Sequence, residues 1–286
     1  MPKSTFKNFV CPIDGRPLLQ GKNSLRCEKG HIFDVAREGY CNLLLVQQKA
    51  SLNPGDNKTM VDARRRFLGD GHFAPIADHL GKIVGEIIKK HRGRSLLRIV
   101  DVGCGEGYYL YQLSKFATVK NSTTNFELAG CDISKWAVKA AAKRSIEIAW
   151  AVAGNRQLPF APNSVDVILS MFGFPDWKSF KAIQPEDGFV LLVDPGPDHL
   201  IELRKIIYPD VKINDVSPLP TECGYKLEQQ NRLKFSVDLQ NNSSIQDLLS
   251  MTPHAFRITQ KAREEIGSLK RFTVTTDVVF RVLYIA

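Results

Sequence analysis

Apolar positions recur along this chain with two different periods, and the period changes near residue 95. Between residues 58 and 91 they return every three or four residues, which predicts amphipathic helices. The sequence Gly-Asp-Gly at 69–71 interrupts the pattern, so we expect two helices with a turn between them. The second helix would bury one apolar face, formed by Ile76, Leu80, Ile83, Val84 and Ile87.

From residue 96 onward, short apolar runs alternate with helical segments. Helices are expected over 108–116, over 134–144 with Ser134 as the N-cap, and over 197–208. Continuous apolar runs are typical of parallel strands that are covered on both faces. The alternation therefore predicts an α/β fold with a doubly wound, mostly parallel, Rossmann-like sheet. The expected strands are 96–102, 126–134, 147–154, 164–172 and 188–194.

The two ends of the chain follow other patterns. Residues 1–45 contain short segments separated by glycine turns, which indicates a small β-rich module. Residues 46–60 are polar, with Asn-Pro-Gly-Asp in the middle, as in a linker. We therefore divide the chain into a front module at 1–45, a linker with helices at 46–94, and a main domain at 95–286. The tail of the main domain is expected to add strands at 232–239 and 272–285 and helices at 245–251 and 259–269.

The front module contains four residues with the spacing of a zinc site. The pattern is Cys11-x2-Asp14-x12-Cys27-x3-His31, and a thiolate would be expected where Asp14 stands. Zinc accepts a carboxylate oxygen, although thiolate suits it better. Three alternatives stay open: zinc bound with Asp14 as the fourth ligand, which we favour; zinc bound by three residues and water; or no metal.

Positive charge is concentrated near the start of the chain. The net charge is +9, and residues 1–66 hold twelve Lys and Arg against six Asp and Glu. This asymmetry predicts a polyanionic partner for the front end, the alternative being a basic surface with no partner. Arg64, Arg65 and Arg66 are candidates for phosphate contacts, the alternative being a solvated helix face.

Composition also bounds the location of the protein. No apolar run is long enough to span a bilayer, and the N-terminus has no signal-peptide core, so no membrane partner is expected. Six cysteines in 286 residues do not form a disulfide framework. We expect a cytoplasmic protein.

A glycine loop at 101–107, Asp-Val-Gly-Cys-Gly-Glu-Gly, joins the first strand of the main domain to its helix. Its glycines let the backbone approach a ligand closely. The third glycine comes one residue earlier than in dinucleotide sites, and Glu106 would repel a phosphate. S-adenosylmethionine has no phosphate and carries positive charge, so Asp101 and Glu106 would meet its cationic end. The loop residues Gly103 and Gly105 are predicted to line the same ligand.

Polar residues end the next two strands. Asp132 is placed to accept both ribose hydroxyls of the cofactor, and Asn155 to contact its adenine. The alternative is a set of turns that are rich in Gly and Asp by coincidence. Ligands of parallel sheets lie at the carboxyl ends of the strands, which favours the cofactor.

The fourth strand should lie beside the methyl acceptor. It lacks the Asn-Pro-Pro-aromatic run of exocyclic amine methyltransferases and the nucleophilic cysteine of cytosine-C5 enzymes. Phe172, Phe174 and Trp177 follow it instead, and these could sandwich a flat base or simply pack the domain. Asp176 is a weak candidate for the general base.

Several longer stretches resemble one known family. They include "CPIDGRPL", "NSLRCEKGHIFDVAREGYCNLL", "ARRRFLGDGHF", "PGPDHLIELRKIIY" and "MTPHAFR". Together they are similar to the 23S rRNA guanine-N1 methyltransferases of the RlmA type, through most of the chain. The resemblance implies methyl transfer from S-adenosylmethionine to N1 of one guanine in a hairpin of 23S rRNA domain II. It also implies an N-terminal zinc module that helps to bind RNA, and a homodimer.

The same resemblance assigns particular positions. The metal positions fall on the four residues of the zinc pattern. The cofactor positions fall on Phe73, Gly105, Glu106 and His199, the alternative for His199 being a polar residue at a helix terminus that water satisfies. Two alternative functions remain: a small-molecule methyltransferase acting on a quinone or an amine, and an RNA-binding homologue without catalysis. The basic front end argues against the first, and the intact glycine loop argues against the second.

Overall fold

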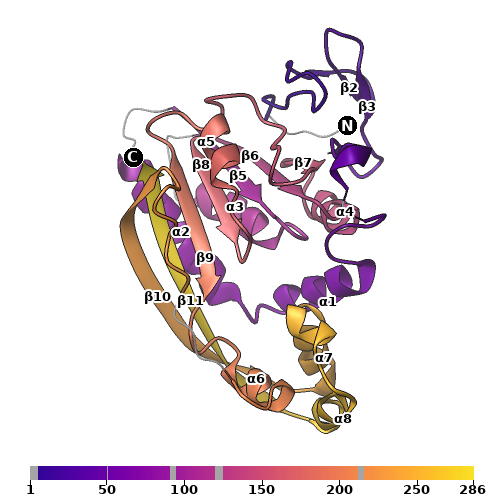
Figure 1. Cartoon of the computed structure of the whole chain (residues 1–286), viewed down its shortest axis with the longest axis vertical. Helices are drawn as coiled ribbons and strands as arrows, with labels where there is room; N and C mark the ends of the chain where they lie inside the picture. Colours follow the sequence, from indigo (N-terminus) through magenta and orange to yellow (C-terminus); the bar gives the residue numbers. More distant parts are fainter. Residues whose placement is uncertain (1–5, 50, 91–94, 120–124, 212–215) are drawn as a thin grey trace.

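Eight strands form the central sheet in the order β10-β11-β9-β8-β5-β6-β7-β4. The computed structural model describes residues 6–49, 51–90, 95–119, 125–211 and 216–286. All neighbours from β4 to β9 are parallel, whereas β11 runs antiparallel to both β9 and β10. The predicted doubly wound, mostly parallel sheet is confirmed (Figure 1). The strands are β4 (Tyr40–Asn42), β5 (Leu96–Val102), β6 (Asn125–Asp132), β7 (Ala149–Val152), β8 (Val167–Met171), β9 (Phe189–Pro195), β10 (Tyr225–Leu239) and β11 (Phe272–Ile285).

Helices cover both faces of this sheet. Residues of α2, α3 and α4 share one apolar core with the sheet, while α5 and the front module pack against the other face. The two helices expected between 58 and 91 are present, and Asn57 caps the first by accepting a hydrogen bond from the Met60 amide. The helices are α1 (Lys58–Gly69), α2 (Ala74–Lys90), α3 (Tyr108–Val119), α4 (Lys135–Arg144), α5 (Trp177–Ile183), α6 (Ile201–Ile207), α7 (Asn242–Ser250) and α8 (Gln260–Ser268), with short 3-10 turns at Val46–Gln48 and Pro253–Phe256.

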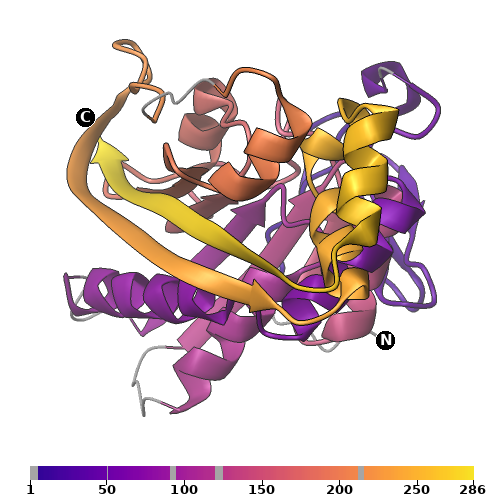
Figure 2. The same cartoon turned by 90° about the horizontal axis from the view of Figure 1, so that it is seen from below.

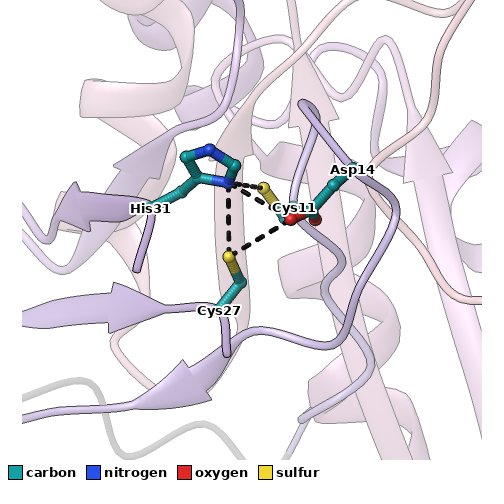
Figure 3. A group of neighbouring side chains, drawn as sticks. All are labelled: Cys11, Asp14, Cys27 and His31. Atoms are coloured by element: carbon teal, nitrogen blue, oxygen red, sulfur yellow. Dashed lines mark hydrogen bonds and ion pairs between the residues drawn. The ribbon is translucent and has the colours of Figure 1, made fainter. Parts of the chain in front are cut away.

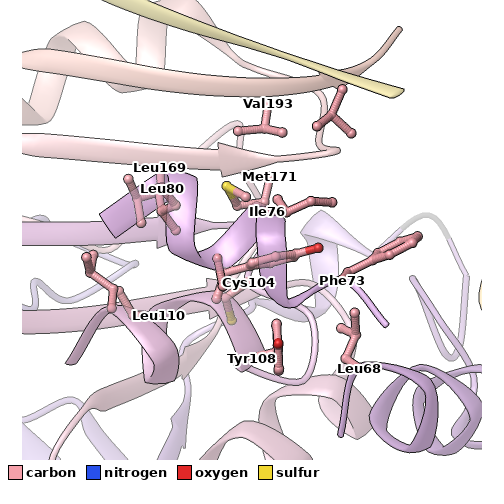
Figure 4. Close-up of a cluster of buried hydrophobic side chains, with 14 of the residues drawn as sticks. Leu68, Phe73, Ile76, Leu80, Cys104, Tyr108, Leu110, Leu169, Met171 and Val193 are labelled. Atoms are coloured by element: carbon pink, nitrogen blue, oxygen red, sulfur yellow. The ribbon is translucent and has the colours of Figure 1, made fainter. Parts of the chain in front are cut away.

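The carboxyl edge of the sheet is the edge that positions the site. Helices α1, α7 and α8 gather below it (Figure 1), and the view from below shows the yellow α7 and α8 in front of this edge (Figure 2). The Arg66 guanidinium donates to both carboxylate oxygens of Asp247, at 2.9 and 2.6 Å, and so joins α1 to α7. Above them, the apolar face of α2 meets the strand ends: Ile76, Leu80 and Met171 lie in one buried cluster (Figure 4).

The front module is a small antiparallel sheet that continues into the central one. Strands β1 (Leu19–Gln20), β2 (Ser24–Arg26) and β3 (Ile32–Asp34) pair in order. The chain then runs through β4, which pairs in parallel with β7 at the edge of the large sheet. The division at 45 therefore falls next to a strand of the central sheet, and the boundary drawn at 94 lies outside the described residues.

Two general expectations can be compared with the fold. All six cysteines are free, which agrees with the absence of a disulfide framework. In the part of the chain that the structure describes, no helix combines the length and apolar character needed to cross a membrane.

Candidate zinc and cofactor sites

The four residues of the zinc pattern converge in the front module (Figure 3). The His31 Nδ1 atom lies 3.4 Å from the Cys11 Sγ, 3.3 Å from the Cys27 Sγ and 3.2 Å from the Asp14 Oδ2. The Cys27 Sγ lies 3.5 Å from the same Asp14 oxygen. All four ligand atoms fall within 4.8 Å of one another.

These distances fit a tetrahedral zinc ion. Zinc bonds of about 2.0–2.3 Å place neighbouring ligand atoms about 3.3–3.8 Å apart at the corners of a tetrahedron. Each cysteine opens a tight turn that ends at a glycine with positive φ, Gly15 at 72° and Gly30 at 88°. The residues present therefore fit the metal, and Asp14 offers a carboxylate oxygen at the fourth position.

The glycine loop lies at the carboxyl end of β5, and its three glycines differ in what surrounds them. Gly103, Gly105 and Gly107 have φ values of 79°, 55° and 81°. A Cβ on Gly103 would meet nothing within 4 Å, so this glycine faces open space. A Cβ on Gly107 would lie 2.8 Å from both the Ala141 Cβ and the Trp150 ring. The first glycine therefore leaves room for a ligand, while the third packs the loop against α4 and β7.

Asp101 is the most unusual group of the site. Its side chain is fully buried, and neither carboxylate oxygen has a hydrogen-bond partner in the described structure. Burial, together with the nearby charge of Asp132, raises the pKa of Asp101 to about 8. A buried carboxyl without a partner is costly unless a ligand supplies one, so this group marks the crevice as a site for a cationic ligand.

Asp132 ends β6 beside this carboxyl. Its Oδ2 accepts the amide hydrogen of Gly105 at 3.0 Å, and its Oδ1 accepts that of Ser134 at 2.7 Å. Each oxygen keeps a second lone pair for a ligand hydroxyl. Asn155, at the end of the next strand, donates from its side-chain amide to the Phe174 carbonyl at 2.6 Å, which leaves its carbonyl oxygen available.

Glu106 has a partner that the sequence did not indicate. The Arg144 guanidinium pairs with one of its oxygens, with Nε at 3.0 Å, while the other oxygen has no partner among the described residues. Burial raises the pKa of Glu106 although Arg144 opposes that shift. Much of the negative charge expected to repel a phosphate is therefore balanced within the protein.

His199 lies among aromatic rings at the same edge. Its ring centre is 6.2 Å from that of Phe73 and 5.9 Å from that of Phe172, and it stacks nearly parallel to Phe172. The His199 Nδ1 accepts the amide hydrogen of Asp277 at 3.3 Å. Burial lowers the pKa of His199 to about 4, so the ring is neutral at physiological pH.

The residues expected beside the acceptor divide into two groups. Phe172, with φ of 55°, and Phe174, which is 88% exposed, lie in the loop after β8. Trp177 instead packs on Tyr225, with ring centres 5.5 Å apart. Asp176 caps α5, since one of its oxygens accepts the amide hydrogen of Ser179 at 3.0 Å.

The arginine triplet is also divided by the fold. Arg64 pairs with Asp56, donates to the Met251 carbonyl at 2.7 Å, and would lie 3.6 Å from a Cβ on Gly105. Arg66 pairs with Asp247. Arg65 is exposed, with no ion pair to another described residue. Arg64 thus points toward the cofactor crevice rather than along a solvated face.

Sequence reasoning missed Arg144, Asp56 and the backbone of Asp277, all of which contact predicted site residues. Their partners lie 38, 8 and 78 positions away along the chain. No local pattern marks such contacts. The only available signal was the basic pair Lys143 and Arg144 in the last turn of the helix at 134–144, which by itself indicates a favourable interaction with the helix dipole.

Comparison with known proteins finds a family model for each of the two sites. The family model described as "RlmA, N-terminal", a zinc ribbon, matches residues 9–52, and a methyltransferase-domain model matches residues 99–186. The 23S rRNA (guanine(748)-N(1))-methyltransferase of Streptomyces fradiae is 33% identical over 204 residues, covering 71% of this chain and 69% of that relative. This chain belongs to the 23S rRNA (guanine-N1)-methyltransferase family. The resemblance seen in the sequence is therefore confirmed.

Two further relatives show how far this family relationship extends. YxjB of Bacillus subtilis (strain 168), provisionally named a 23S rRNA (guanine-N1)-methyltransferase, is 29% identical over 280 residues, 96% of this chain and 95% of its own length. A protein of Micromonospora griseorubida with the same provisional name is 31% identical over 217 residues, 71% of this chain and 70% of its own. YxjB, which is matched over 96% of this chain, spans both the zinc ribbon and the methyltransferase domain. Zinc and S-adenosylmethionine are the cofactors that these two parts take.

Proposed function

We propose that this chain transfers a methyl group from S-adenosylmethionine to N1 of one guanine in a hairpin of 23S rRNA domain II. The observation that carries the proposal is the joint match of the zinc ribbon and the methyltransferase domain to relatives named for this reaction. The geometry supports it, because the crevice holds a buried Asp101 whose carboxylate has no partner among the described residues, and such a group suits a cation.

Four groups would hold the cofactor, which supplies an electrophilic methyl group on its sulfonium. Asp101 would face the cationic end, and Asp132 would accept the ribose hydroxyls with its remaining lone pairs. Gly103 leaves the space that the ligand needs. The free carbonyl oxygen of Asn155 would accept a hydrogen from the adenine amino group. Binding by these fixed groups aligns the methyl with the acceptor and excludes water.

His199 would hold the opposite charge of the cofactor. Because its Nδ1 accepts a hydrogen bond from the Asp277 amide, the single hydrogen of the neutral ring is on Nε2. That N–H can donate to a carboxylate, while Phe73 and Phe172 fix the orientation of the ring. Glu106, balanced by Arg144, would keep the loop in place rather than carry a free charge to the ligand.

The acceptor would lie over the loop after β8. A hairpin guanine must leave its stack to enter, at a cost of a few kcal/mol, and the exposed ring of Phe174 offers a surface on which it can restack. Guanine N1 carries a hydrogen that must leave during transfer. Asp176 retains one carboxylate oxygen outside its capping bond and is our candidate to accept this proton.

Three wider assignments belong to the same proposal. The zinc ribbon and the exposed Arg65 would contact the phosphate backbone of the RNA. A homodimer would shape the RNA-binding cleft, as the family resemblance implies. The enzyme would work in the cytoplasm, where ribosomal RNA and reduced cysteines are found together.

A labelling experiment tests the proposal directly. The zinc-loaded protein is incubated with labelled S-adenosylmethionine and an unmodified transcript of 23S rRNA domain II, and the product is mapped by reverse transcription. Because N1 methylation blocks Watson–Crick pairing, we expect one strong stop at a hairpin guanine. Label that enters only small molecules would support the small-molecule alternative, and cofactor binding without transfer would support the inactive homologue.

A further inference from the structure

A small groove lies between the front module and the start of α4. Its volume is about 50 Å³. Residues from four segments line it: the end of β4, the linker, the start of α4 with Ile133 before it, and the end of β7. The lining residues are Asn42, Leu44, Lys49, Leu52, Asn53, Pro54, Ile133, Lys135, Trp136 and Val152.

Exposed apolar groups are concentrated at this groove. The Trp136 side chain is 42% exposed and that of Leu52 is 93% exposed. The other two tryptophans differ, because Trp150 is 2% exposed and Trp177 packs on Tyr225. An indole at the first turn of a helix, left open to solvent beside a second large apolar side chain, indicates a contact surface.

The charge around the groove is of one sign. Lys49 and Lys135 line it, and no carboxylate does. Helix α4 carries Lys135, Lys139, Lys143 and Arg144 and no acidic residue. Lys139 and Arg144 pair with acidic partners, whereas Lys135 and Lys143 have no ion-pair partner in the described structure. The surface therefore complements a polyanion.

The position of the groove connects the two known parts of the enzyme. Ile133 lines it and directly follows Asp132 of the cofactor crevice. The linker is fixed there, since the Ser134 hydroxyl donates to the Asp56 carbonyl at 2.6 Å and Asp56 pairs with Arg64. A nucleic acid strand that runs from the zinc ribbon toward the crevice would cross this groove.

We infer that this groove binds an unpaired nucleotide of the RNA substrate. Its base stacks on the Trp136 indole beside Leu52, and Lys49 and Lys135 contact the phosphates on either side. Single-stranded RNA is commonly held by such a combination of an aromatic ring and nearby cations. Because the groove holds only about 50 Å³, too little for a whole base, the base lies on the indole at its mouth. The inference rests on the proposed rRNA substrate.

The test measures binding of the full-length, zinc-loaded enzyme to the unmodified domain II transcript. Trp136→Ala is expected to weaken RNA binding about 10-fold, the loss of one stacked base, while Trp136→Phe retains most of the affinity. Replacing both Lys49 and Lys135 with Ala is expected to reduce the slope of log K against log salt by about 1.4. S-adenosylmethionine affinity should not change in any of these variants.

Two control variants change exposed side chains that do not line the groove. Ile146→Ala removes an exposed apolar side chain just beyond α4, and Lys261→Ala removes a distant exposed lysine; neither should alter RNA binding. The inference is overturned if Trp136→Ala, folded by circular dichroism, binds the transcript like wild type. It is also overturned if light scattering shows that this variant changes only the oligomeric state, which would make the groove a contact between copies of the chain. If wild type binds cofactor but neither binds nor methylates the transcript, the proposed function fails instead.

Discussion

Asp101 combines full burial with a carboxyl group that has no partner in the described structure. Since its pKa is raised to about 8, the free protein holds a proton there at pH 7. A cationic ligand favours the ionised form, so binding of S-adenosylmethionine should release about one proton at pH 7 and tighten as the pH rises toward 8. Calorimetry in two buffers with different ionisation enthalpies measures this release, and Asp101→Asn should abolish it.

The same carboxyl has an opposite effect on the stability of the free protein. Because its folded pKa lies above its unfolded value of about 4, its contribution is fully present at low pH and is lost as the pH rises from about 4 through 8. The melting temperature of Asp101→Asn, measured without cofactor across this range, should therefore fall less steeply than that of wild type. An identical slope in both proteins would show that Asp101 is solvated and ordinary.

Gly103 and Gly107 provide a matched pair of substitutions. Both have positive φ, so alanine costs about 1–2 kcal/mol of backbone strain at either position. At Gly107 the new Cβ also meets Ala141 and Trp150, which adds about 1–3 kcal/mol. Urea denaturation should find Gly107→Ala the less stable variant, whereas cofactor titration should find Gly103→Ala the weaker binder. If Gly107→Ala proved the weaker cofactor binder instead, Gly103 would not face the ligand.

The sequence alone predicted site residues correctly where the members of one site lie close together along the chain. The zinc quartet converges as expected, because turns at Gly15 and Gly30 bring nearby residues together. It did not predict that Arg64 and Arg66 have partners within the chain. Those partners, Met251 and Asp247, lie 187 and 181 positions away, and only the tertiary fold brings them close.

The zinc ribbon contributes only a few apolar side chains to the core that it shares with the central sheet, so its own stability should depend on the metal. Asp14→Cys should bind zinc more tightly than wild type, because thiolate is the softer ligand, and Asp14→Ala should bind it more weakly. Competition with a chromophoric chelator ranks the three proteins. Cofactor affinity, measured in parallel, should stay constant; equal zinc affinity in all three would exclude Asp14 from the site.

Most elements were predictable because their apolar period is long and regular, as in α2 and β11. Two were not. Strand β4 has only three residues, and its pairing with β7 depends on a neighbour more than a hundred positions away. Helix α5 begins within the aromatic run after β8, which we interpreted as part of an acceptor loop. Strand β10 begins at Tyr225, earlier than predicted, because its first half is mostly polar.

At the scale of the whole molecule, most of the net positive charge and the cofactor-binding carboxylates belong to different parts of the chain. The first 66 residues hold twelve Lys and Arg against six Asp and Glu, which is +6 of the net +9, whereas the cofactor crevice is built around Asp101 and Asp132. RNA affinity should therefore fall at least about 10-fold between roughly 50 and 200 mM salt, as phosphate contacts are screened. Cofactor affinity should change little, because Asp101 is buried and poorly screened. Equal salt dependence of the two ligands would contradict this separation.

Strand β4 has a consequence for anyone who would build chimeras from this family. The module that carries the metal also supplies the last hydrogen-bonded edge of the catalytic sheet, with Tyr40 opposite Trp150. Exchanging residues 1–45 between two relatives would give the host sheet an edge strand from another protein. Deleting them would leave β7 as an unpaired edge strand, able to pair with other molecules. The zinc ribbon and the methyltransferase sheet are thus tied by backbone pairing, and a graft of the ribbon should leave residues 40–42 native.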